Sequence, residues 1–270
     1  MIQKVGYYTK HKWFTKNHIY DWVSCLSIFV VEQILTNFVI NPRIRYEPTN
    51  FTLVDYPLIP DIVPAWLLLI ICILLPLAIF GGFYAYYRNS HDLHHAALGL
   101  VQTFTVTMLF TDFLKIIASR YRPDYAARVA LEGVASRLAR DGRLSFPSGH
   151  SSLSFSCMAF LSFYIAGKTK VFRKDGGSMW KVLLCLVPFM ISSLIAVSRT
   201  VDYHHDFSDI TAGAFIGLSC GVFIYFVNFN SLFSKECALP KSRVSPNYAK
   251  DHGLLYSERE YTSLAISSDL

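Results

Sequence analysis

The sequence is poor in charged residues. Of its 270 residues only 16% are Asp, Glu, Lys or Arg, whereas 53% are hydrophobic. A soluble globular domain carries about 25% charged residues. The apolar residues here are also gathered into blocks that are long enough to cross a bilayer. The composition therefore excludes a soluble enzyme, a secreted disulfide-rich module and a disordered chain, and it predicts a polytopic membrane protein.

Paired cysteines are also lacking. The sequence has six cysteines, and none has the CxxC or Cys/His spacing of a zinc site. Five of them fall inside apolar blocks, where we expect buried, reduced side chains. The net charge of +6 is explained by basic residues beside membrane spans, which are attracted to anionic headgroups. We therefore predict no metal, no cofactor and no nucleic-acid partner.

Six apolar blocks predict an all-α fold, a polytopic bundle of six transmembrane helices. The blocks are roughly residues 22–41, 64–87, 93–116, 149–167, 180–198 and 207–228. Lysine and arginine are concentrated in residues 1–20, in 168–179 and after 229, so the positive-inside rule assigns these segments to the cytosol. The loop 118–147 opposes that rule, because it carries six arginines on the far side.

Three short stretches carry chemistry that suits a phosphate group. They are 115–123, 147–150 and 198–209, and the predicted topology places all three at the non-cytosolic face. Lys115 and Arg122 are seven residues apart, which on a helix is two turns, so both would project from one side before Pro123 stops the helix. The first stretch therefore predicts two cations beside one anion.

The other two stretches add further ligands for an anion. Ser148 occupies an N-cap position, and Gly149 lets the backbone approach a phosphate closely, so that the first amides of the fourth span would point at it. Arg199 offers a planar fork for two phosphate oxygens. We therefore expect both stretches to contribute to the same anion site.

The histidines suggest a catalytic pair. His205 and Asp209 are four residues apart, so the carboxylate can orient one imidazole nitrogen, and His150 from another loop can take a complementary role. The residues alone do not distinguish His204 from His205. Together with their acidic neighbours these side chains also permit a metal cluster. The cations of the other two stretches favour phosphate instead.

In order, Lys-x6-Arg-Pro, Pro-Ser-Gly-His and Ser-Arg-x5-His-x3-Asp resemble the three-part signature of the type 2 phosphatidic acid phosphatases, also called lipid phosphate phosphatases. The resemblance covers about residues 93–228. The segments Phe146–Ser152 and Ser198–Tyr203 are most similar to the eukaryotic branch that includes diacylglycerol pyrophosphate phosphatases. The resemblance implies a cytosolic segment at 1–21, a six-span phosphatase domain at 22–228 and a cytosolic tail at 229–270.

The resemblance also implies a mechanism that needs no Mg²⁺. His205 would attack phosphorus to form a phosphohistidine, Asp209 would orient it, and His150 would protonate the leaving oxygen and later activate water. The phosphoryl oxygens would be held by Lys115, Arg122, Ser148, Gly149 and Arg199. The expected substrates are phosphatidate, diacylglycerol pyrophosphate and related lipids. A tyrosine-based sorting signal at 261–264 would agree with an endomembrane location, and a homo-oligomer is compatible with the fold.

Other interpretations stay open at this point. An isoprenoid (dolichyl-type) diphosphate phosphatase is the nearest alternative among enzymes, and a non-catalytic lipid-binding scaffold is the alternative of a different class. We expect the remaining arginines of the 118–147 loop to contact headgroups or solvent. We expect Glu32, His94 and His95 to be structural, and Asp112 to pair with Lys115 or bond between helices. Asn50 begins a glycosylation sequon.

Overall fold

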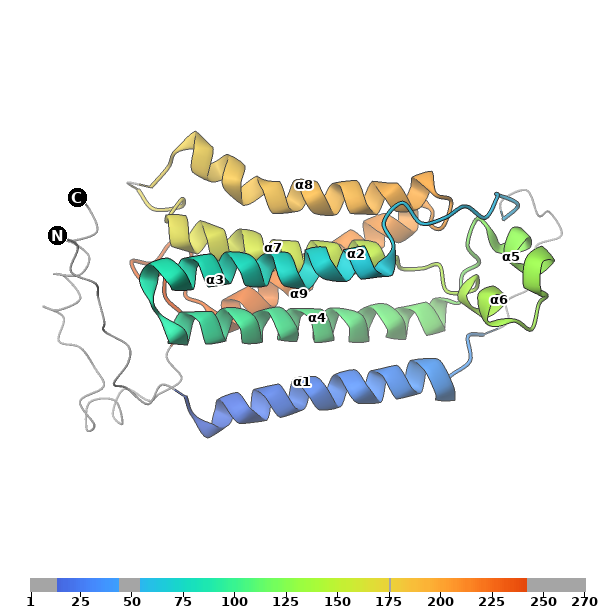
Figure 1. Cartoon of the computed structure of the whole chain (residues 1–270), viewed down its shortest axis with the longest axis horizontal. Coiled ribbons are helices and arrows are strands. Elements are labelled where there is room, and N and C mark those ends of the chain that lie inside the picture. The colour runs from blue at the N-terminus through green and yellow to red at the C-terminus, as the bar shows by residue number, and fades with distance from the viewer. Residues whose placement is uncertain (1–13, 44–53, 175, 242–270) are drawn as a thin grey trace, which may run out of the picture.

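A computed structural model describes residues 14–43, 54–174 and 176–241, and within them the chain is all-α. The elements are α1 (Lys16–Ile34), η1 (Leu35–Val39), α2 (Ala65–Leu69), η3 (Ile70–Leu74), α3 (Leu75–Tyr87), α4 (Ser90–Ala118), α5 (Tyr125–Glu132), α6 (Arg137–Asp141), α7 (Gly149–Thr169), α8 (Met179–Val201) and α9 (Phe207–Asn228). The long helices run side by side, and the short helices α5 and α6 lie beyond one end of them (Figure 1). Asn50, the segment 261–264 and most of the predicted 1–21 and 229–270 segments lie outside the described residues.

Five helical segments are long and apolar enough to cross a membrane. They are Lys16–Val39, Ala65–Tyr87, Ser90–Ala118, Met179–Val201 and Phe207–Asn228. These segments agree with five of the six predicted spans. The remaining predicted span corresponds to α7, which has 21 residues but is rich in serine and does not reach the same hydropathy. The count of six spans therefore stays a prediction.

The serines of α7 are explained by its place in the bundle. Helix α7 packs against α4, α8 and α9, so most of its side chains face protein. Ser162 Oγ donates to the Cys185 carbonyl at 2.5 Å, and Ser152 Oγ accepts from Thr111 Oγ1 at 2.8 Å. Polar residues within a membrane bundle are tolerated where such partners satisfy them. A helix enclosed in this way does not need the hydropathy of a lipid-facing span.

Helices α7 and α9 approach each other unusually closely, because α9 presents a row of glycines. A Cβ atom built on Gly217 would lie 2.1 Å from the Ser152 carbonyl oxygen, and one on Gly221 would lie 2.3 Å from that of Ser156. The spacing of four residues keeps the glycines on one face of α9, as in small-residue interfaces of membrane helices. At the end of this contact the Ser148 amide donates to the Asp209 carbonyl at 3.0 Å. The glycines therefore bring two of the signature stretches together.

The opposite end of the bundle is fastened around Asp92. This carboxylate accepts hydrogen bonds from Tyr164 Oη at 2.7 Å and from Lys168 Nζ at 2.5 Å, which ties α4 to α7.

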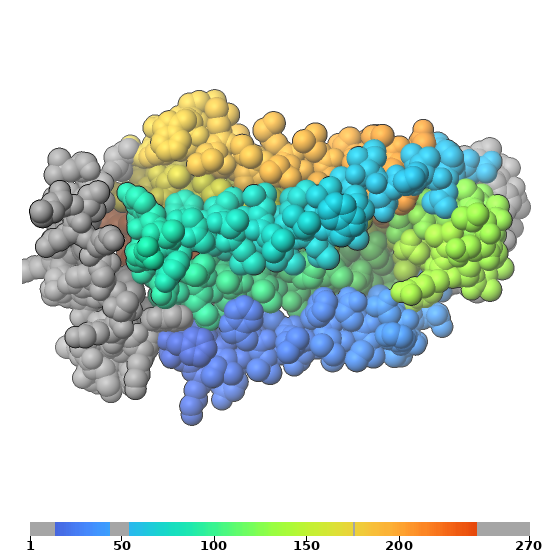
Figure 2. Space-filling view, viewed as in Figure 1, coloured from blue at the N-terminus to red at the C-terminus, as the bar shows by residue number. Residues whose placement is uncertain are grey.

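Helix α1 lies at the edge of the bundle along α4 (Figure 2). Asp112 of α4 lies close enough to Glu32 of α1 and to Lys115 to interact with both, in agreement with the expected contact between helices. All six cysteines are free, and five of them are buried.

Candidate functional site

The three signature stretches meet at the end of the bundle that carries α5 and α6 (Figure 1). Lys115 Nζ, one turn before the end of α4, donates to the Leu144 carbonyl at 3.1 Å and to the Pro147 carbonyl at 2.8 Å. The second stretch is joined to the third through the Ser148–Asp209 backbone hydrogen bond. Residues far apart in the sequence thus surround one region.

The first stretch differs from the sequence expectation in its local structure. Helix α4 ends at Ala118, and Ser119 adopts a left-handed conformation with φ of 42°, so Arg122 is not two helical turns beyond Lys115. Arg122 instead lies in the following loop, where its amide donates to the Gly142 carbonyl at 2.8 Å and its guanidinium pairs with Asp141 at 2.9 Å. The prediction of one shared helix face was wrong, because the chain reverses at Ser119 before it reaches Arg122.

The second stretch starts α7. Ser148 is the N-cap residue, as predicted, but its side chain makes no capping hydrogen bond. Its hydroxyl is buried and has no hydrogen-bond partner among the residues that the structure describes. A Cβ atom on Gly149 would lie 3.7 Å from Lys115 Cε, so this glycine faces the lysine. A buried hydroxyl and a helix N-terminus beside a lysine favour an anionic ligand.

The third stretch supplies the most deeply buried cation. Arg199 is 1% exposed and makes ion pairs with Asp61 at 2.7 Å and Asp202 at 3.1 Å. One of its nitrogens also donates to the Val63 carbonyl at 3.2 Å. The Arg199 carbonyl in turn accepts from the His205 amide at 3.0 Å. Arg199 is therefore held in place by both its side chain and its backbone.

His205 is buried and lies beside Asp209. Its Nδ1 is 3.6 Å from Asp209 Oδ2 and 3.4 Å from Ser145 Oγ. Ser145 Oγ donates to Asp209 Oδ2 at 2.5 Å, and the Asp206 amide donates to the same oxygen at 3.1 Å. Asp209 is thus fixed by donors on both sides, and the other ring nitrogen of His205, Nε2, points away from the carboxylate. Ser145 was not predicted, since no motif in the sequence marks it.

The electrostatic surroundings keep His205 uncharged. Burial lowers the pKa of His205 well below its ordinary value, and the positive charges of Arg122, Lys115 and Arg199 act in the same direction. Because the unperturbed pKa of histidine is about 6.5, His205 is neutral at physiological pH in this environment. A neutral imidazole surrounded by cations has the lone pair that a nucleophile requires.

His150 lies in the first turn of α7. Its Nε2–H donates to the Val63 carbonyl at 3.0 Å, the same oxygen that Arg199 contacts. His150 is also near enough to His205 to contribute to the lowering of the His205 pKa. The structure therefore brings both predicted histidines to one region, from α7 and from the loop before α9.

Residues 54–64, before α2, contact this region, and no motif in the sequence predicts that they do. The Ile62 amide donates to Asp202 Oδ2 at 3.3 Å, and the Tyr56 and Tyr203 rings stack with their centroids 5.0 Å apart. Although burial alone would raise the pKa of Asp61, its hydrogen bond and ion pair with Arg199 hold that pKa below the ordinary value. Asp61 is therefore ionised and forms an ion pair with the guanidinium of Arg199.

Two arginines that were expected to contact headgroups or solvent have protein partners instead. Arg120 makes ion pairs with Asp206 at 2.7 Å and Asp209 at 2.9 Å. Arg128 is buried and contacts both oxygens of Asp124 at 2.8 Å. Despite burial, which acts in the opposite sense, these contacts raise the pKa of Arg128 above its ordinary value. For both residues the expectation was wrong: the partners of Arg120 come from the start of α9, whereas that of Arg128 lies four residues earlier in the chain.

Three potential metal ligands, Asp61, Asp202 and His204, also lie together here. Arg199 pairs with both carboxylates, so each of them already has a cationic side chain as a partner. His204 Nδ1–H donates to the Asp202 carbonyl at 2.6 Å, and its Nε2 is 3.1 Å from Asp61. This arrangement separates the two neighbouring histidines: His204 belongs to the ion-pair network, whereas His205 faces Asp209.

Comparison with known proteins agrees with the motifs. A family model described as PAP2 superfamily matches residues 96–232. A PA-phosphatase related-family protein of Dictyostelium discoideum is 65% identical, and the match covers 100% of both chains. Probable lipid phosphate phosphatase 4 of Arabidopsis thaliana is 37% identical over 80% of this chain and 74% of its own. Probable diacylglycerol pyrophosphate phosphatase 1 of Schizosaccharomyces pombe is 31% identical over 83% of this chain and 85% of its own.

No solved structure matches the chain. The family match covers the signature stretches, the bundle helices α7, α8 and α9 and most of α4, so the resemblance inferred from the motifs is confirmed. Several apolar helices of spanning length accompany it. The chain therefore belongs to the PAP2 superfamily and is a multi-pass membrane hydrolase of the lipid phosphate phosphatase family.

Proposed function

We propose that the protein hydrolyses lipid phosphates through a phosphohistidine formed on His205. The observation that carries this proposal is a buried, neutral imidazole whose Nδ1 faces Asp209 while Lys115, Arg122 and Arg199 act on it electrostatically. A phosphate drawn in by these cations would meet the remaining nitrogen, Nε2. Phosphoryl transfer depends mainly on positioning and on stabilising charge, and this arrangement supplies both.

The reaction would proceed in two displacements. In the first, His205 Nε2 attacks phosphorus, the bond from phosphorus to the lipid oxygen breaks, and His150 gives its proton to that oxygen. In the second, His150 takes a proton from water, the resulting oxygen attacks phosphorus, and the bond to Nε2 breaks to release inorganic phosphate. Asp209, held by Ser145 and the Asp206 amide, stabilises the positive charge on His205 between the two steps.

The phosphoryl oxygens would be held by Lys115, Arg122 and Arg199, the Ser148 hydroxyl and the Gly149 amide. The buried Ser148 hydroxyl supports this role, because within the described residues it lacks the partner that buried polar atoms normally have. Three cations around one phosphate can supply the charge that Mg²⁺ supplies in other phosphatases. We therefore propose that turnover needs no added metal.

The substrate would be a phosphorylated lipid such as phosphatidate or diacylglycerol pyrophosphate. Relatives carry the names lipid phosphate phosphatase and diacylglycerol pyrophosphate phosphatase, and the site lies at the end of helices that are apolar enough to be in lipid. We propose that α7 is the sixth span, that the site faces the non-cytosolic side of an endomembrane, and that both termini are cytosolic. Acyl chains could then stay in the bilayer while the headgroup reaches the site.

A panel of lipids tests the proposal directly. Purified protein in detergent micelles is offered phosphatidate, lysophosphatidate, diacylglycerol pyrophosphate, a sphingoid phosphate and an isoprenoid diphosphate, and phosphate release is measured with and without EDTA. We expect release from at least one diacyl lipid in the presence of EDTA. Complete loss of activity that Mg²⁺ restores would contradict the metal-independent mechanism, and a strong preference for the isoprenoid diphosphate would favour the alternative enzyme.

Adjacent histidines provide a matched pair of variants. His205→Ala should abolish phosphate release, whereas His204→Ala should retain measurable release because His204 lies in the neighbouring ion-pair network. His150→Ala should slow turnover by roughly 10²- to 10⁴-fold, as expected for loss of a general acid. Mass spectrometry of acid-sensitive phosphoryl groups on the quenched protein should find one on His205. An active His205→Ala protein would assign the nucleophile elsewhere. A parent protein that releases phosphate from no lipid of the panel would favour the scaffold.

A further inference from the structure

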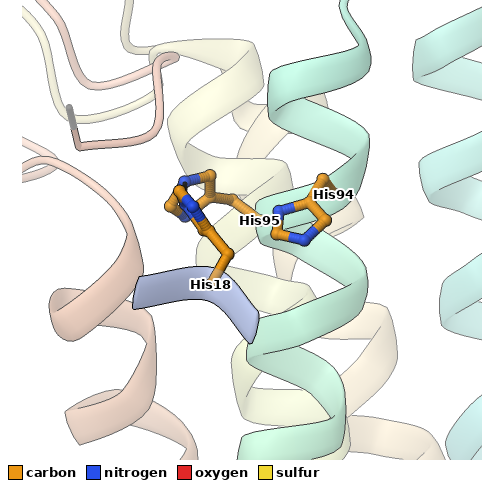
Figure 3. Close-up of side chains that lie close together, drawn as sticks. All are labelled: His18, His94 and His95. Carbon is orange, nitrogen blue, oxygen red and sulfur yellow. Dashed lines mark hydrogen bonds between the residues drawn. The ribbon is translucent and has the colours of Figure 1, made fainter. Parts of the chain in front are cut away.

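Three histidines meet at the opposite end of the bundle from the phosphate site. His18 lies in the first turn of α1, and His94 and His95 lie near the start of α4, so the cluster joins two helices (Figure 3). His18 and His95 are fully buried. One ring nitrogen from each histidine lies within 4.8 Å of those of the other two. We call His18, His94 and His95 the histidine cluster.

We propose that the histidine cluster binds a divalent transition metal, with Zn²⁺ as the most suitable ion. The Nε2 atoms of His18 and His95 face each other at 3.2 Å. Two imidazole nitrogens on one tetrahedral zinc, each about 2.0–2.1 Å from the metal, are separated by about 3.3–3.4 Å. The observed pair therefore already has the spacing of two ligands on one ion.

The third histidine is placed to complete the set. The His94 ring lies 5.0 Å from that of His18 and 5.7 Å from that of His95, measured between centroids. Since all three nitrogens lie within 4.8 Å of one another, the His94 ring needs to move inward by no more than about 1.5 Å to reach a tetrahedral separation. Three protein nitrogens then leave the fourth position of the ion for water. Neutral imidazoles favour zinc, copper or nickel over Mg²⁺ and Ca²⁺, which prefer oxygen.

The surroundings orient the rings. His18 Nδ1 accepts a hydrogen bond from the Thr15 amide at 3.0 Å and also lies 3.0 Å from Thr15 Oγ1. Metal binding through Nε2 would place the ring proton on Nδ1 and exchange the amide donor for the Thr15 hydroxyl as acceptor, as in the outer partners of zinc-bound histidines. Trp22 Nε1–H donates to His94 Nε2 at 3.1 Å. If His94 bound the metal through Nδ1, its ring proton would lie on Nε2. The hydrogen bond from Trp22 to Nε2 would then be lost, and a bond from Nδ1 to the metal would form.

The nearby carboxylate of Asp92 is unsuited to serve as a ligand. It already accepts from Tyr164 and from Lys168, with which it forms a buried ion pair. The candidate site is therefore built from imidazoles alone, and it differs in chemistry from the cation-rich phosphate site at the other end of the bundle. This inference does not depend on the proposed phosphatase mechanism.

A metal in the histidine cluster would fasten α1 to the rest of the bundle. In the apolar stretch of α1 that could span a membrane, only 11% of the residues are buried in the protein, against 39% in that of α4. A helix with so little buried surface gains more from a metal link than a central helix would, because its packing contributes less. We therefore assign the metal a structural role.

Metal content and spectroscopy test the proposal. The protein is purified through a tag without histidine, stripped with EDTA, and loaded with Co²⁺ or Zn²⁺ before free metal is removed. We expect about one bound ion per chain and, for Co²⁺, the intense visible absorption of a tetrahedral nitrogen site. Zn²⁺ should also raise the thermal unfolding temperature, because it binds the folded state.

Variants show whether the ion occupies this cluster. His18→Ala, His94→Gln and His95→Ala should each lose the stoichiometric ion, whereas His91→Ala in the same region of α4 and His205→Ala in the phosphate site should keep it. Of the three substitutions, His94→Gln should disturb folding least, because His94 is less buried than His18 and His95. A parent protein with no bound ion at micromolar metal, or folded cluster variants that bind as the parent does, would overturn the proposal.

Discussion

The substitution Asp61→Asn tests whether the Asp61 carboxylate competes with the phosphate of the substrate for the guanidinium of Arg199. Asp61 Oδ1 lies 2.7 Å from Arg199 and 3.1 Å from His204 Nε2. Asparagine has nearly the same shape and keeps an oxygen acceptor, but it carries no charge. If the phosphate must replace Asp61 on Arg199, the substitution should lower KM and leave kcat nearly unchanged.

The expected change follows from the exposure of this ion pair. A hydrogen bond to a charged group is worth about 1.5–3 kcal/mol when it is well buried. The Asp61 side chain is 37% exposed, so solvent screening reduces the difference between Asp and Asn to about 0.5–1 kcal/mol. At 1.4 kcal/mol per tenfold change this corresponds to a KM that is about two- to fivefold lower. Since the pKa of Asp61 is below its ordinary value, the parent carries this charge throughout the neutral pH range.

The assay measures initial rates against the surface mole fraction of the preferred lipid phosphate in mixed micelles. Asp55→Asn is the matched control, because it removes the same charge from the same connection and the described residues include no ion pair to Asp55. We expect Asp55→Asn to behave as the parent does. A KM for Asp61→Asn that is unchanged, or that rises severalfold with a fall in kcat, would refute competition and show that Asp61 positions Arg199 instead.

Three further substitutions test the framework of the site. Ser145→Ala removes the 2.5 Å donor of Asp209 and should lower kcat by about tenfold with little effect on KM, the loss expected for one hydrogen bond to a charged group. Gly217→Ala places a Cβ atom 2.1 Å from the Ser152 carbonyl, so it should destabilise the protein by about 1–3 kcal/mol in thermal unfolding, whereas Gly82→Ala, with nothing within 4 Å of the added atom, should not. The folded protein keeps His205 neutral, whereas His205 of the unfolded chain takes up a proton below about pH 6.5. The free energy of unfolding should therefore fall by up to about 1.4 kcal/mol for each pH unit below that value. His205→Asn should make this acid loss shallower in unfolding curves.

Local patterns in the sequence predicted most of the helices well, and they identified histidines and cations that the fold brings to one end of the bundle. Long apolar blocks identified α1, α4, α8 and α9 and the combined segment of α2, η3 and α3, because hydropathy over 20 residues depends little on tertiary contacts. The spacing of His205 and Asp209 predicted their neighbourhood, since residues four apart share a helix face. The sequence also places the start of α7 at Ser148, where the N-cap lies.

Long-range charge pairing could not be predicted in the same way. Arg120 was expected to contact solvent or headgroups, but its partners Asp206 and Asp209 come from the start of α9. Asp61 reaches Arg199 from 138 positions earlier in the chain. Such pairs depend on which loops meet, and a single sequence does not give that information. The glycines of α9 recur every four residues, and this pattern in the sequence would have predicted close packing of α9 against another helix, which the structure shows to be α7.

The pairing of charges suggests which cation attracts the substrate first. Arg120, Arg122 and Arg199 each have a carboxylate partner, so much of their positive charge is balanced. Lys115 differs, because its two hydrogen bonds go to the carbonyls of Leu144 and Pro147, which accept hydrogen bonds without neutralising the charge. Its carbon chain also lies beside Gly149, at the start of α7. An approaching phosphate would therefore first meet the amides of α7 and the ammonium of Lys115, which has no ion pair among the described residues, and it would contact Arg199 only after Asp61 moves away. On this view Lys115 determines the capture of the phosphate, and the Asp61–Arg199 ion pair controls its advance toward His205.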